Sequence, residues 1–74
     1  MSRDEQLKAL QDDVDVLAAA DEGTALASLP YWDSLAILLV ISHFEQAYGM
    51  EIKGSQVRAC RTVADILDLG LPHR

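Results

Sequence analysis

The sequence contains little that would crosslink the chain, interrupt its helices or carry it across a membrane. It has one cysteine, two prolines and one tryptophan among 74 residues. A single cysteine excludes an internal disulfide framework and suits a reducing compartment. The apolar run from Leu35 to Ile41 is far too short to span a bilayer, and the charged N-terminus lacks the apolar core of a signal peptide. We therefore expect a soluble, cytoplasmic protein.

Positive charge is also scarce. Six lysines and arginines stand against twelve aspartates and glutamates, which gives a formal net charge of -6 at pH 7. A surface of this sign repels nucleic acid and anionic lipid and attracts basic patches on other proteins. Half of the residues are hydrophobic, which is too many for a disordered tail. The composition thus favours a folded domain with protein partners.

The length allows one small domain, covering residues 1–74. A domain near this size buries only about 60% of the surface that its unfolded chain exposes, which leaves little room for an enclosed active site. The sequence therefore favours a module that is modified or bound over an enzyme.

A first helix is indicated by apolar residues that recur at steps of three and four, at Leu7, Leu10, Val14 and Leu17. This spacing is one stripe of an amphipathic helix, and we expect the helix to cover about residues 4–20. A loop follows it, because Pro30 disfavours helix at the residue before it.

A second helix is expected over residues 34–48. Asp33 is a good N-cap, nothing in the segment breaks a helix, and Gly49 ends it. At about 100° per residue, six apolar side chains fall within one arc, which we expect to face the core. They are Ile37, Val40, Ile41, Phe44, Ala47 and Tyr48.

The opposite arc of this helix is mixed. Its polar residues are Ser34, Ser42, His43, Glu45 and Gln46, and we expect His43 to be a solvated surface residue. The same arc also carries Leu35, Leu38 and Leu39. A helix that only covers a core has no need of three leucines on its polar side, so they indicate a contact surface.

Two shorter helices are expected over residues 55–60, with Val57 and Cys60 inward, and over residues 62–69. Thr62 caps the last one, with an aspartate in the reciprocal position three residues later. No strand pattern competes with these helices, and the connections are short. The sequence therefore predicts an all-α fold, a small antiparallel four-helix bundle with three longer helices and one short one.

Two chemical roles are open to Ser34. A hydrolase nucleophile needs a neighbouring base, but His43 lies on the opposite side of the same helix, and the flanking residues lack a G-x-S-x-G elbow. A serine at a helix N-terminus is instead well placed to carry a phosphodiester, which free backbone N–H groups and the positive end of the helix dipole stabilise. In that role Asp33 positions the hydroxyl or helps a partner enzyme to recognise it.

Three blocks of sequence support the second role. They are an Asp-Ser-Leu motif at residues 33–35, an aromatic-Gly-x-x-Ile motif at 48–52 and a Thr-Val-x-Asp-Ile segment at 62–66. With these blocks in this order and at this spacing, the chain resembles the acyl carrier proteins, also called phosphopantetheine-binding domains. The resemblance covers roughly residues 26–69.

This resemblance implies that a phosphopantetheinyl transferase attaches 4′-phosphopantetheine from coenzyme A to Ser34, beside Asp33 and Leu35. The arm then holds an acyl or aminoacyl group as a thioester for the loading and downstream enzymes, while the carrier itself catalyses nothing and holds no metal. Tyr31 and Trp32 precede the motif, and few acids lie on the second helix. Both features resemble carriers of specialised pathways, such as polyketide or nonribosomal peptide synthesis.

Partner enzymes are expected to dock beside Ser34, where the exposed leucines face whatever protein uses the attached group. The residues expected at this surface are Leu35, Leu38, Leu39, Ser42, Glu45 and Trp32. We expect a monomeric, discrete subunit. The alternative is an unmodified helical adaptor that binds a partner protein through the same leucines.

Overall fold

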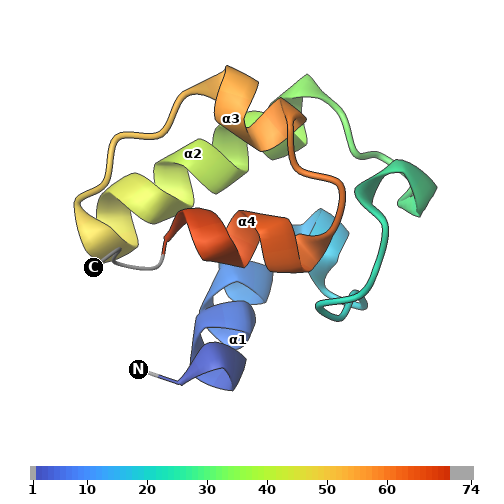
Figure 1. Cartoon of the computed structure of the whole chain (residues 1–74), viewed down its shortest axis with the longest axis horizontal. Coiled ribbons are helices and arrows are strands. Elements are labelled where there is room, and N and C mark those ends of the chain that lie inside the picture. Colours follow the sequence, from blue (N-terminus) through green and yellow to red (C-terminus); the bar gives the residue numbers. More distant parts are fainter. Residues whose placement is uncertain (1, 71–74) are drawn as a thin grey trace.

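The computed structural model describes residues 2–70, and over that span the apolar stripes form helices packed into a small bundle (Figure 1). The α-helices are α1 (Arg3–Asp13), α2 (Ser34–Tyr48), α3 (Gly54–Arg58) and α4 (Val63–Leu69). Two 3₁₀ turns, η1 (Asp15–Leu17) and η2 (Leu26–Ser28), lie in the connection between α1 and α2. The expected all-α fold is confirmed, since residues 2–70 form no strand longer than a single bridge.

The first helix begins at a capping box that the sequence analysis did not identify. The Ser2 hydroxyl accepts a hydrogen bond from the Glu5 amide at 3.2 Å, and the Glu5 carboxylate accepts one from the Ser2 amide at 3.1 Å. This pair satisfies two backbone donors that a helix N-terminus otherwise leaves free.

The expected end of this helix near residue 20 is wrong, because α1 stops at Asp13 and Val14 is extended. Val14 is β-branched, and acidic side chains at the carboxyl end of a helix meet the negative end of its dipole. Asp12 and Asp13 both lie in the last turn of α1, which has no basic residue. The turn η1 follows, and Val14 and Leu17 are still fully buried.

Local signals placed the ends of the later helices well. Gly49 ends α2 in the left-handed conformation, with φ of 65°. Thr62 caps α4 and forms the expected reciprocal pair with Asp65. The short helix α3 starts one residue before the expected range of 55–60 and ends two residues earlier. Val57 is fully buried, as expected, but Cys60 is only half-buried.

The core faces a slightly different arc of α2 than the sequence indicated. Val40 and Phe44 are fully buried as expected, but the expected core residue Ala47 is exposed. The expected surface residue His43 is instead 3% exposed. The buried arc is therefore turned toward His43, because α1 packs against that side of α2.

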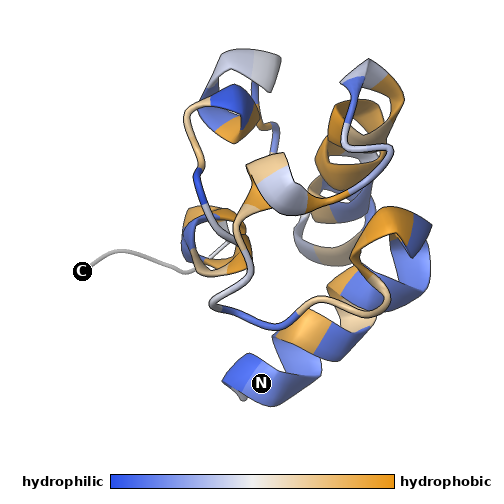
Figure 2. Cartoon of the chain, turned by 90° about the vertical axis from the view of Figure 1, so that its right-hand side faces the viewer, coloured by the Kyte–Doolittle hydropathy of each residue, from blue (hydrophilic) through white to orange (hydrophobic). Residues whose placement is uncertain are grey.

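The loop before α2 is held against the start of α4. The Leu26 amide donates to the Arg61 carbonyl at 2.9 Å, and the Val63 amide donates to the Thr24 carbonyl at 3.2 Å. Arg3 reinforces this contact, since its guanidinium bonds Glu22 and Asp68. Figure 2 shows hydrophobic residues along most of α2, the helix that follows this loop.

Candidate functional site

The turn that leads into α2 separates two aromatic side chains. Tyr31 is left-handed, with φ of 67°, and it is the only residue other than glycine within residues 2–70 with a positive φ. Its side chain is 82% exposed, whereas the next residue, Trp32, is half-buried against the core. Trp32 therefore packs against the core, whereas Tyr31 projects into solvent beside the start of α2.

Asp33 caps α2 as the sequence predicted. One carboxylate oxygen accepts hydrogen bonds from the amides of Leu35 at 3.1 Å and Ala36 at 3.2 Å. The expectation that these N–H groups are free to hold a phosphate is therefore wrong. What remains for an anion at this end is the positive end of the dipole and the Ser34 amide.

Ser34 is the first residue of α2 and is exposed. Within residues 2–70 its hydroxyl has no hydrogen-bond partner, so the oxygen can react without breaking a contact. The hydrogen bonds from the amides of Leu35 and Ala36 to Asp33 fix the backbone around Ser34 and leave its side chain open to solvent. An exposed, unengaged hydroxyl at a rigid helix start fits an attached phosphodiester.

The three leucines of α2 are exposed as expected: Leu35 by 64%, Leu38 by 60% and Leu39 by 37%. We call them the leucine strip. Ser42 and Glu45, on the same side of α2, are also exposed. Tyr31 completes the set of large exposed apolar side chains in the described part of the chain. The predicted contact residues of α2 are thus exposed along one side of the helix, which begins at Ser34, whereas the ring of Trp32 is partly covered.

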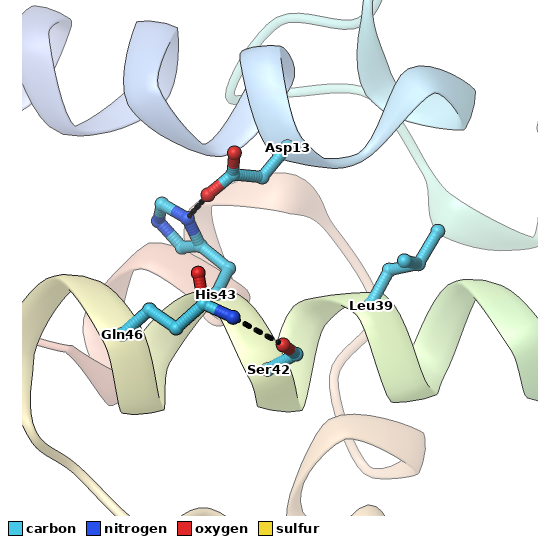
Figure 3. Close-up of a pocket in the computed structure, with 5 residues that line it drawn as sticks. All are labelled: Asp13, Leu39, Ser42, His43 and Gln46. Carbon is cyan, nitrogen blue, oxygen red and sulfur yellow. Dashed lines mark hydrogen bonds and ion pairs between the residues drawn. The ribbon is translucent and has the colours of Figure 1, made fainter.

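A shallow pocket of about 190 Å³ lies next to the strip, where the end of α1 meets α2 (Figure 3). It is lined by Asp13, Leu39, Ser42, His43 and Gln46. His43 Nδ1 lies 2.6 Å from a carboxylate oxygen of Asp13, and Gln46 donates to the Ser42 hydroxyl at 3.1 Å. Sequence reasoning missed this pairing, because no local signal joins residues 30 positions apart.

Serine, histidine and aspartate side chains meet in this pocket, but not as a hydrolase triad. His43 Nε2 is buried, and within residues 2–70 it has no hydrogen-bond partner. The Ser42 hydroxyl instead accepts from Gln46. A triad needs the histidine nitrogen opposite the carboxylate to accept the serine proton, and that contact is missing here.

The single thiol is not poised for chemistry. Burial, with smaller effects from the charges of Asp65 and Asp68, raises the pKa of Cys60 to about 11. The thiol is therefore protonated near neutral pH and is neither a strong nucleophile nor a ready metal ligand. Residues 2–70 hold no cluster of three or more His, Cys, Asp or Glu that could bind a metal ion.

In comparisons with known proteins, no family model, no curated protein and no solved structure matches this chain at a significant level. Among the helices of residues 2–70, none combines the length and the apolar character that a membrane crossing requires.

Proposed function

We propose that this protein is an acyl carrier that is modified with 4′-phosphopantetheine on Ser34. The observation that carries the proposal is the setting of Ser34: an exposed, unengaged hydroxyl on the first residue of α2, directly after the Asp33 cap. The sequence motifs at residues 33–35, 48–52 and 62–66 support the same role.

Each neighbouring residue has a task in this function. Asp33 holds the first turn of α2 rigid, so that a partner enzyme meets the Ser34 hydroxyl in one position. The dipole of α2 stabilises the negative charge of the attached phosphodiester. The leucine strip gives partner enzymes an apolar area next to the attachment point.

Attachment exchanges one phosphorus–oxygen bond for another. The Ser34 oxygen attacks the phosphorus that bears the pantetheine arm in coenzyme A, the phosphoanhydride bond breaks, and adenosine 3′,5′-bisphosphate leaves. The serine proton passes to a base of the transferase. The arm supplies a terminal thiol that holds an acyl or aminoacyl group as a thioester.

The cytoplasm, where coenzyme A is available to a transferase, is the compartment that this function requires. Tyr31 and Trp32 before the motif, together with a leucine-rich α2, favour a specialised pathway such as polyketide or nonribosomal peptide synthesis. A second candidate function is an unmodified helical adaptor, which the 64% and 60% exposure of Leu35 and Leu38 favours without any need for Ser34.

Intact mass spectrometry separates the two functions. The purified protein is incubated with coenzyme A, magnesium and several broad-specificity phosphopantetheinyl transferases. We expect a mass gain of one phosphopantetheine unit, lost in Ser34→Ala and kept in the matched variant Ser28→Ala, which removes another exposed serine hydroxyl. If the unit appears on another serine, or on none, the adaptor function replaces the carrier.

A further inference from the structure

Charge is unevenly distributed around α2. The sequence has no lysine or arginine between Lys8 and Lys53, and the acids of this stretch include a cluster at the end of α1. That cluster consists of Asp12, Asp13 and Asp15. Three of the six basic residues lie instead on α3 and beside it: Lys53, Arg58 and Arg61.

The structure places these opposite charges on the two edges of the leucine strip. Helix α2 packs against both α1 and α3. At about 100° per residue, the strip lies between His43 on one edge of α2 and Ile37 on the other. His43 bonds Asp13 at the end of α1, so the acidic edge adjoins Leu39.

The basic edge adjoins Ile37. A Cβ placed at Gly54, the first residue of α3, would lie 3.8 Å from the Arg58 guanidinium and 4.0 Å from the Ile37 side chain, so the start of α3 lies beside Ile37. Ser34 is one helical turn before Ile37 and is nearer to this edge. Glu45, the one acid within α2, is about 12 Å further along the helix from Ile37.

The charges at the acidic edge are available to a partner. Asp12 and Asp15 are exposed, and within residues 2–70 their side chains have neither an ion pair nor a hydrogen bond. A stable dimer of this chain would take about 800 Å² from each partner, about one sixth of its 4750 Å² surface. The strip offers only three partly exposed leucine side chains for such an interface. A transient encounter guided by charge fits the strip better.

We propose that the acidic and basic edges of the leucine strip fix the orientation of the transferase that modifies Ser34. This inference rests on the proposed function. Its surface meets the leucine strip with apolar side chains, places basic side chains over Asp12 and Asp15, and places acidic side chains over Lys53 and Arg58. The enzyme therefore recognises the direction of the charge gradient across α2 and not only the net charge of the carrier.

A charge-exchange variant tests this directly. Asp12→Lys and Asp15→Lys together raise the net charge by four units. Lys53→Glu and Arg58→Glu together lower it by four units, so the fourfold variant keeps the net charge of -6. All four side chains are exposed. The control variant Asp4→Lys/Lys8→Glu also keeps the net charge, and it exchanges two exposed charges near the start of α1. Circular dichroism checks that each variant is folded.

The readout is kcat/KM for phosphopantetheine attachment by one broad-specificity transferase that modifies the wild-type protein. At an ionic strength of about 0.01 M, we expect the fourfold variant to be slower by at least about tenfold and the control to be within about twofold. The difference in kcat/KM between the fourfold variant and the wild type narrows at about 0.15 M, because the Debye length falls from about 30 Å to about 8 Å. Each half-exchange, on one edge alone, is expected to give an intermediate loss.

The outcomes separate the two proposals. If Ser34 is modified equally fast in the wild type and the fourfold variant, the oriented docking is wrong and the carrier function stands. If the two half-exchanges change the rate in opposite directions and cancel in the fourfold variant, net charge alone matters and the docking proposal is again wrong. If no transferase modifies the wild type, the carrier function itself fails.

Discussion

The backbone of Tyr31 is left-handed, a conformation that a residue with a Cβ disfavours. A left-handed residue with a Cβ costs roughly 1–2 kcal/mol, and such strain in a structure often lies at a functional site. The phenol ring recovers little of this by burial, because it is 82% exposed.

We predict that Tyr31→Gly raises the stability of the domain by up to about 1 kcal/mol. Glycine removes the strain of roughly 1–2 kcal/mol but loses roughly 0.5–1 kcal/mol through its greater freedom in the unfolded chain. Tyr31→Ala keeps a Cβ and should bring no gain. Urea unfolding of the three proteins gives the comparison. A marked loss of stability in Tyr31→Gly would show that the exposed ring makes contacts that stabilise the fold.

At the scale of single helices, the sequence predicted what depends on neighbouring residues and missed what depends on packing. The caps at Asp33, Gly49 and Thr62 are local hydrogen-bond patterns, so they could be read from the chain. The burial of His43 could not, because it follows from a bond to Asp13 on another helix. For the same reason, the sequence correctly predicted that Leu35, Leu38 and Leu39 are exposed on α2, but it wrongly predicted that His43 is exposed.

The pairing of α1 with α2 gives the prediction at this scale. Asp13→Ala leaves the buried His43 ring without a partner, and we expect a loss of about 1–3 kcal/mol in the free energy of unfolding. His43→Leu replaces the ring by an apolar side chain, and it should change stability by less than about 1.5 kcal/mol. Urea denaturation of both single variants and the double variant measures the coupling.

The double variant decides whether the bond is the cause. On the His43→Leu background, Asp13→Ala should cost less than about 0.5 kcal/mol, since no buried nitrogen remains to be satisfied. An equal cost on both backgrounds would mean that Asp13 stabilises α1 by another route.

At the scale of the whole molecule, contacts between distant segments hold the loop that presents Ser34. The bonds of Arg3 to Glu22 and Asp68 join the first helix, the loop and the last helix. Composition and periodicity contain no signal for such pairs, which depend on the complete arrangement of the helices. The end of α4 also packs closely against α2, because a Cβ at Gly70 would overlap the ring of the fully buried Phe44.

We therefore predict that Gly70→Ala destabilises the domain by about 1–3 kcal/mol through overpacking. Gly23→Ala is the matched control, because the nearest atom to its Cβ is at an ordinary distance of 3.6 Å. Thermal unfolding should show a clear loss for Gly70→Ala and little change for Gly23→Ala. The loss should shrink on a Phe44→Leu background, where the ring is absent. An undiminished loss there would show that Phe44 is not the obstacle.

The central claim, that Ser34 carries a phosphopantetheine arm, is tested most directly on the protein isolated from its native cells. The measurement is the intact mass, followed by fragmentation of the peptide that contains residues 33–35. The carrier function predicts a population heavier than the sequence by one phosphopantetheine unit, bound to Ser34 and released as a single fragment. A native population that carries only the unmodified mass, under conditions in which the cells' other carriers are modified, would contradict it.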